Sequence, residues 1–365
     1  MIYTLAIDWL SIFCVYEGAD TLIPIDSDQF TYKRESFGTR CFSTFHRVRM
    51  PNAEGGIDEF AEIQSSPYSS ILPEYAVIIR FVNRALYLPN FWELADDLLL
   101  ANNLTCQGIS RIDICADFNE FKEINPRALI EGFAAKRLRH IGRGVGALYF
   151  NHGKGAEKDE HGKPLPDYGV NYTGLTFGTH SSDAHVYLYN KTFELLTQGD
   201  KPWIKDSWRA AGLDLREVWR LEISIKSQGL KFKDKTTGKR VEVDVPMIYD
   251  RHELNKIFQT FVRKLFAFIK NKPKITNVSR EPRLVLFDES LPAYDRGAIR
   301  NISSGNRMEK ILIKSLYQFA DRYRGRYIFE AQERARSLAQ SLAYGTGLGE
   351  WYEVKVNEWE TPVHK

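Results

Sequence analysis

Alternating apolar and polar residues over the first two-thirds of the chain predict a sheet of several strands. Strand-like segments occupy residues 3–16, 75–87, 109–118, 146–150, 174–179, 184–192 and 217–226, and residues 58–66 are ambiguous. Helices are predicted at residues 89–103 and at 125–142, the second ending at Gly142. Because strands adjoin strands instead of alternating with helices, we predict an α+β fold with a largely antiparallel central sheet flanked by helices.

The hydrophobic period changes near residue 251. Leu254, Ile257, Phe258, Phe261 and Leu265, followed by Phe268 or Ile269, recur at helical spacing. A further helix pair is predicted at residues 307–324 and 328–345. The pattern therefore divides the chain into a sheet-bearing domain at 1–250 and a helical region at 251–365.

Composition and charge narrow the class of protein. Of the 365 residues, 43% are hydrophobic and 27% charged, as in a soluble globular protein, and the net charge of +3 excludes a histone-like polycation. Residues 1–100 hold 7 basic and 14 acidic side chains, so a polyanion is expected to bind the later two-thirds of the chain. No Cys-x-x-Cys pair occurs, which favours free thiols in a reducing cytoplasm over a zinc or redox motif. The N-terminal segment contains Asp8 and lacks a basic leader, which favours a buried strand, and no membrane span is expected.

Three predicted strands place ionisable groups on one face. Alternate residues of a strand point to the same side, which groups Arg111, Asp113, Cys115 and Asp117; Arg220, Glu222, Ser224 and Lys226; and His185, Tyr187, Tyr189 and Lys191. Taken singly, each strand suits a solvated surface with weak cross-strand ion pairs. If the three strands are neighbours, the groups converge on one patch, but the sequence leaves the strand order open.

Such a patch has a chemical use. Clustered carboxylates prefer a hard cation such as Mg²⁺ or Mn²⁺, which can polarise a phosphodiester. Arginine or lysine can clamp its oxygens, and an activated tyrosine can serve as nucleophile. Strand parity cannot choose between Tyr187 and Tyr189, because both point the same way.

Three segments in this order, SRIDICADF, LTFGTHSSDAHVYLYNKTFE and VWRLEISIK, resemble the motifs of the Rep-trans family of rolling-circle plasmid replication initiators and related conjugative relaxases. The resemblance covers about residues 75–230. It implies that Tyr189, which precedes Asn190 and Lys191, is the nucleophile and that Gly178 and Ser182 shape the hairpin before it. It also implies metal ligation by Asp113, Asp117 and Glu222, and phosphate or tyrosinate contacts by Arg111, Arg220 and Lys191.

The resemblance further implies a replication initiation reaction. One DNA strand is nicked at the origin of a plasmid or mobile element, Tyr189 takes the 5′-phosphate, and a 3′-OH is released. The family's initiators act as homodimers and recruit a host helicase. The chain departs from the pattern at Cys115, at Phe177 and in the long loop at residues 151–172, and residues after about 285 have no match. No His-hydrophobe-His triplet occurs, which favours carboxylate ligation.

Other basic segments leave their roles open. Residues 226–240 carry Lys226, Lys231, Lys233, Lys235, Lys239 and Arg240, which suit either DNA phosphate contacts or a solvated hairpin. We expect residues 1–250 to form the catalytic nicking domain and 251–365 a DNA-binding or accessory region. Two alternatives remain: a relaxase with the same chemistry, and a non-catalytic origin-binding protein. The glycine-rich segment at 142–147 lacks the Lys-Ser/Thr pair of a P-loop, so no built-in ATPase is expected.

Overall fold

The computed structural model describes the chain except residues 19–21, 53–54, 69–71, 143–145, 151–171, 180–181, 273–279, 298–311, 313–314, 317–328, 346–347, 350–351, 354 and 357–365. The chain divides into two compact units, Met1–Gly297 and Ala298–Lys365. The sequence pattern placed this division after residue 250. The segment at 251–297 instead belongs to the first unit, and the roles assigned to the two regions stay predictions.

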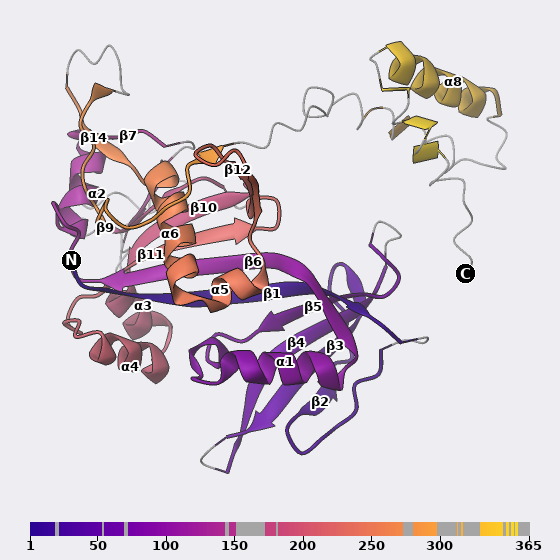
Figure 1. Cartoon of the computed structure of the whole chain (residues 1–365), viewed down its shortest axis with the longest axis horizontal. Coiled ribbons are helices and arrows are strands. Elements are labelled where there is room, and N and C mark those ends of the chain that lie inside the picture. The colour runs from indigo at the N-terminus through magenta and orange to yellow at the C-terminus, as the bar shows by residue number, and fades with distance from the viewer. Residues whose placement is uncertain are drawn as a thin grey trace, which may run out of the picture. The chain divides into compact units, whose positions relative to one another are not determined.

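A ten-stranded sheet forms the centre of the first unit (Figure 1). Its order is β2-β3-β4-β5-β1-β6-β11-β10-β9-β8. The strands, in chain order, are β1 Tyr3–Tyr16, β2 Thr31–Arg34, β3 Phe42–Pro51, β4 Ile57–Pro67, β5 Ala76–Phe81, β6 Leu104–Phe118, β8 Gly146–Phe150, β9 Tyr172–Phe177, β10 Ala184–Asn190 and β11 Trp219–Lys226. Every pairing among them is antiparallel, so the predicted α+β fold with its antiparallel sheet is confirmed.

Two small sheets and several helices complete the described part of this unit. The small sheets are β13-β12-β15, built from Arg240–Glu242, Lys231–Asp234 and Arg296–Gly297, and β14-β7, built from Phe268–Lys270 and Leu138–His140. The helices are the 3₁₀ turn η1 Ala85–Tyr87, α1 Phe91–Ala101, α2 Pro126–Ala134, α3 Lys191–Gln198, α4 Pro202–Ala210, α5 Val245–Tyr249 and α6 Arg251–Leu265.

The apolar face of the sheet holds the main core. Register places Ile7, Ile114, Ile223 and Val186 side by side on adjacent strands, and all four are buried. Burying a side chain of this size stabilises the fold by roughly 1.5–3 kcal/mol. Helix α6 packs on this face, with Phe258 in the same cluster. The apolar face is thereby covered, and the opposite, polar face carries the candidate chemistry.

Local structure differs from the predicted helices at two places. Helix α2 ends at Ala134 instead of Gly142, because Lys136 adopts a left-handed conformation (φ 56°) and the chain continues as β7. Helix α6 ends at Leu265, and Phe268 and Ile269 lie in β14, not in the helix. Each of these short strands pairs with the other, so a tertiary contact overrides the local helical pattern.

Several elements were not predicted. Strands β2 and β3 carried no recognised signal, the ambiguous segment at 58–66 lies in β4, and α3 and α4 fill the connection between β10 and β11. The basic segment at 226–240 does form a hairpin, β12 to β13, as one of its two interpretations proposed. The loop at 151–172 lies almost wholly outside the described residues.

The second unit contains α8, Phe329–Gly345, which matches the helix predicted at 328–345. Ala339, Ala343, Leu348 and Tyr352 form its small buried cluster. The helix predicted at 307–324 falls mostly outside the described residues.

All four cysteines are free thiols. Among the described residues, no helix combines the length and apolarity needed to cross a membrane.

Candidate active site

The three motif strands are neighbours in the sheet. Strands β10, β11 and β6 follow one another, and β1 lies beyond β6. In the register, Tyr189 stands opposite Arg220, which stands opposite Asp117; Tyr187 stands opposite Glu222. Directly opposed residues share a face, so the ionisable groups converge on one patch. The sequence predicted this patch only on the condition that the three strands are neighbours, and they are.

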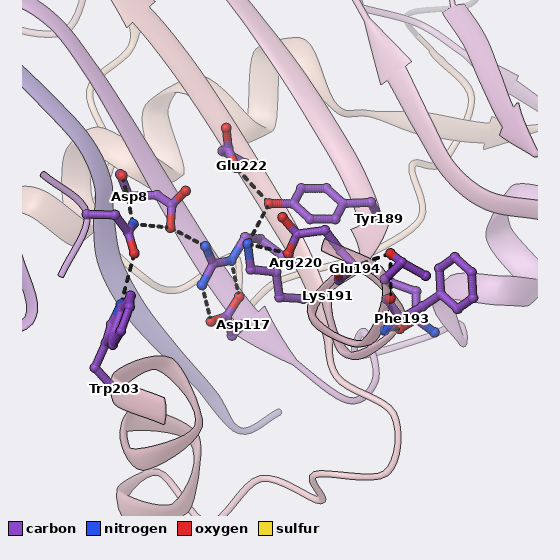
Figure 2. A network of polar contacts seen from close by, with 12 residues as sticks. Asp8, Asp117, Tyr189, Lys191, Phe193, Glu194, Trp203, Arg220 and Glu222 are labelled. Carbon is purple, nitrogen blue, oxygen red and sulfur yellow. Dashed lines mark hydrogen bonds and ion pairs between the residues drawn. The ribbon is translucent and has the colours of Figure 1, made fainter. Parts of the chain in front are cut away.

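Tyr189 is the centre of this patch (Figure 2). Its hydroxyl donates a hydrogen bond of 2.9 Å to Glu222 Oε2, and Lys191 Nζ lies 3.5 Å from the same hydroxyl oxygen. The Lys191 side chain is only 1% exposed, and its Nζ lies 2.8 Å from Glu194. The tyrosine oxygen therefore has both an acceptor and a buried cation in reach.

The Asn-Lys pair after Tyr189 explains this geometry. Asn190 ends β10, and its side-chain oxygen accepts a 2.8 Å hydrogen bond from Phe193 N, which caps helix α3. Lys191 is the first residue of that helix and turns back toward the tyrosine, with its Nζ 5.4 Å from the ring centre. Asn190 thus acts as a helix cap, which the family resemblance alone did not explain.

The electrostatics favour a protonated tyrosine. Burial and the nearby Glu222 carboxylate raise the pKa of Tyr189 well above its ordinary value, and Arg220 opposes them. Burial, together with repulsion from Asp8 and Asp113, raises the pKa of Glu222 to about 7. A tyrosine in this setting needs a base or added positive charge before it can attack.

Arg220 belongs to the same patch and is fully buried. Its Nε and Nη2 donate to the two oxygens of Asp117 at 2.6 and 2.7 Å, and Nη1 also binds Asp8. Trp208, on α4, donates a 2.7 Å hydrogen bond to Asp117 Oδ2. The family resemblance implies a phosphate or tyrosinate contact for Arg220 and metal ligation for Asp117, but here the two form an internal ion pair.

Asp8 is the residue that sequence reasoning did not place in the site. It comes from β1, where the register shifts between Ile7 and Trp9. Its Oδ1 accepts from Asn83 at 3.0 Å, and Asn83 in turn accepts from Trp203 on α4 (Figure 2). Burial opposes ionisation, but Arg220 and then Lys191 hold the pKa of Asp8 below its ordinary value. The signal available in the sequence was that Asp8 is a single acidic residue within an otherwise mostly apolar predicted strand.

Arg111 and Asp113 form the other end of the patch. Arg111 donates to both oxygens of Asp113, at 2.9 Å from Nε and 2.5 Å from Nη2. Burial raises the pKa of Asp113, and Arg111 opposes the shift. Arg111 is 38% exposed along its side chain and Asp113 4%, so the guanidinium is the more accessible partner.

The carboxylates fit a divalent cation only in part. Within the described ranges, no three or more His, Cys, Asp or Glu side chains are grouped to hold a metal ion. Both oxygens of Asp117 are occupied by Arg220 and Trp208, which does not suit direct ligation. Asp113 and Glu222 do share the polar face and repel each other, and a bound Mg²⁺ or Mn²⁺ would relieve this repulsion between two oxygen donors.

The predicted hairpin before β10 is present. Gly178 has φ 92°, a conformation that glycine adopts without strain. Ser182 Oγ accepts from Thr179 N at 3.3 Å, and Ser182 N donates to Thr179 O at 2.9 Å. These contacts shape the turn that leads into the tyrosine strand.

The proposed DNA-binding basic residues lie beside the sheet. Lys226 ends β11, and the others follow β12, its turn and β13. Lys231 pairs with Glu242 at 2.5 Å, Arg240 with Glu242 at 3.6 Å, and Lys235 with Asp295 at 3.3 Å. Lys233 and Lys239 are exposed. Their role in DNA binding stays a prediction.

The chain resembles known proteins in structure and not in sequence-based comparisons. No family model matches the chain, and no curated protein matches it. Among solved structures, a rolling circle replication initiator protein from Geobacillus stearothermophilus is similar to it over 78% of this chain and 93% of that one, with 14% sequence identity and a TM-score of 0.41.

Proposed function

We propose that the protein is a DNA-nicking and strand-transfer enzyme that starts rolling-circle replication of a plasmid or mobile element. The observation that carries the proposal is the contact of the Tyr189 hydroxyl with Glu222 at 2.9 Å and its approach to buried Lys191 at 3.5 Å. The three motif segments that resemble the Rep-trans family meet at this point of the sheet.

The proposed reaction exchanges one phosphate ester for another. The Tyr189 oxygen attacks the phosphorus, its proton passes to Glu222, and the bond from phosphorus to the 3′-oxygen breaks. The 5′-phosphate stays on the tyrosine, and the 3′-oxygen takes up a proton to become a free hydroxyl. Lys191 would stabilise the charge on the attacking oxygen.

Asp113 and Glu222 are the residues that would hold a divalent cation. When bound, Mg²⁺ or Mn²⁺ would polarise the phosphodiester and offset its developing charge. Asp117 is left out of this set because Arg220 and Trp208 bind it. Arg111, beside Asp113 and partly exposed, would contact a phosphate oxygen.

Tyr187 provides the matched control for the nucleophile. Supercoiled plasmid carrying the element's own origin is incubated with wild type, Tyr189→Phe or Tyr187→Phe and Mn²⁺, and open circles and protein–DNA adducts are counted on denaturing gels. We expect Tyr187→Phe to nick and Tyr189→Phe to form no adduct. No open circles with wild type would overturn the function, and loss with Tyr187→Phe alone would move the nucleophile.

Partners follow from the same proposal. The DNA would be the element's origin, single-stranded at the nick, and the enzyme would act in the cytoplasm. The homodimer and the host helicase that the resemblance implies are further parts of the proposal. Light scattering of the protein with and without origin DNA tests the dimer.

A further inference from the structure

A row of mostly basic side chains crosses seven strands on the polar face. The register of β11, β6, β1, β5, β4, β3 and β2 places directly opposite one another Lys226, Arg111, Ser11, Arg80, Glu62, Arg47 and Lys33. Neighbouring strands lie ~4.8 Å apart, so the six spacings span roughly 29 Å. We call its five basic members the basic row.

Trp9 fixes the centre of the basic row. The guanidinium carbons of Arg80 and Arg111 each lie 4.7 Å from the centre of its ring. They come from β5 and β6, the strands on either side of β1, so they reach the ring from two sides. Cation–π contacts of this kind hold the planar guanidinium groups in place.

The acidic partners of Arg80 and Arg111 lie deeper than the cations they bind, whereas Glu59, at 40% exposure, lies no deeper than its partner Arg47, at 31%. Glu62 is 8% exposed against 35% for Arg80, and Asp113 4% against 38% for Arg111. A guanidinium has five N–H donors, and the hydrogen bonds to Asp113 use only two of those of Arg111. At Arg80 and Arg111 the row therefore presents donors and positive charge outward. Lys33 and Arg47 are also ion-paired, with Glu35 and Glu59, so carboxylates balance much of the net charge.

We propose that the basic row binds the phosphate backbone of single-stranded DNA that leads away from Tyr189, with Arg80 and Arg111 as the central phosphate contacts and Trp9 as their positioning residue. This inference rests on the proposed function and adds the path of its substrate. Charge complementarity supports it, since a single strand is a polyanion whose proteins combine basic tracks with aromatic groups. The row has one side chain from each strand, which suits contact with the phosphate backbone of one DNA strand.

The basic row continues directly from the site. Lys226 and Glu222 share a face of β11 and lie four residues, or ~13 Å, apart. Its other end lies in the acidic first hundred residues, which supply Lys33, Arg47 and Arg80. The acidic charge of residues 1–100 therefore argued against DNA binding in this region. Strand pairing nevertheless brings the few basic residues of this region into one row.

The test measures binding without chemistry. The protein in EDTA is titrated into a fluorescein-labelled oligothymidylate of about 20 nucleotides, and anisotropy gives the affinity between about 50 and 200 mM NaCl. Arg80→Gln and Arg111→Gln should each weaken binding several-fold and reduce the slope of log affinity against log salt by about 0.7. Arg209→Gln, which removes an exposed ion-paired arginine on α4, should leave both unchanged.

Two further variants separate folding from binding. Arg80→Gln leaves Glu62 buried without its partner, so Glu62→Gln/Arg80→Gln is measured beside it, and thermal melting checks both. Trp9→Leu should lose affinity at an unchanged salt slope, and Trp9→Phe should restore it. Wild-type affinity and slope for Arg80→Gln, no binding of the oligothymidylate by wild type, or stronger binding of an equal-length duplex would each overturn the proposal.

The outcome is independent of the nicking assay. Tyr189→Phe should bind the oligothymidylate like wild type. If wild type fails to nick but the Arg80 and Arg111 variants reduce the slope of log affinity against log salt, the proposed function is wrong and the proposal for the basic row is supported. If nicking depends on Tyr189 but the arginine variants keep the wild-type salt slope, only the proposal for the basic row is wrong.

Discussion

The guanidinium of Arg220 binds both carboxylate oxygens of Asp117 across two neighbouring strands, at 2.6 and 2.7 Å, and both side chains are buried. Trp208, on helix α4, donates a further hydrogen bond to the same Asp117 carboxylate. The motif resemblance implies a phosphate or tyrosinate contact for Arg220 and metal ligation for Asp117. Their contacts with each other instead give them a structural role on the strands beside Tyr189.

Replacing Arg220 should destabilise the protein strongly. Arg220→Met leaves the buried Asp117 and the partly buried Asp8 without their cation, and losing one partner of a buried ion pair typically costs about 3–5 kcal/mol. Urea unfolding measures this loss, and Arg209→Met, at an exposed ion pair, should stay within about 1 kcal/mol of wild type. A fully stable Arg220→Met that no longer nicks would instead return Arg220 to a direct role with DNA.

Lys191 should matter for the rate of adduct formation. Lys191→Met keeps the length of the buried side chain but removes the cation 3.5 Å from the Tyr189 oxygen. We expect adduct formation to slow by about 10²–10³-fold, as when one group that stabilises a developing charge is lost. Lys205→Met, which breaks an ion pair with Asp200 outside the site, is the matched control. Equal rates for the two variants would remove Lys191 from the mechanism.

Glu222 should make stability depend on pH in metal-free buffer. Burial raises its pKa in the folded state from 4.5 to about 7, so the folded state holds the proton more tightly than the unfolded state. Its contribution is complete below pH 4.5 and is lost as the pH rises to about 7, at a cost of about 3 kcal/mol. Urea unfolding of wild type and Glu222→Gln in EDTA, from acid to neutral pH, measures the difference. Parallel curves for the two proteins would contradict this.

A divalent cation should stabilise the protein through Asp113 and Glu222. Ligand at a hundred times its dissociation constant adds about 2.7 kcal/mol to the free energy of unfolding. Mn²⁺ should therefore raise the melting temperature of wild type, but not that of Asp113→Asn or Glu222→Gln. Asp117→Asn should melt lower yet keep the Mn²⁺ shift. If that shift disappears too, Asp117 is a ligand, as the sequence first suggested.

Strand parity gave most of the polar face correctly, but it wrongly placed Lys191 on the strand, because β10 ends at Asn190 and Lys191 begins helix α3. Arg111, Asp113, Glu222 and Tyr189 do share one face, because the alternation of side chains along a strand is a local property of the backbone. The same locality explains the failures at Lys136 and Phe268. Their helical pattern was overridden by pairing between two segments far apart in the chain.

The sequence by itself determined which residues each strand turns to the polar face and which tyrosine precedes the Asn-Lys pair. Only the tertiary structure decided which strands are neighbours, that Asp8 enters the site, and that Arg220 and Asp117 are buried together. It also assembled the basic row from strands that are separated along the chain. Strand order and burial depend on contacts between distant segments, which no local period of a sequence encodes.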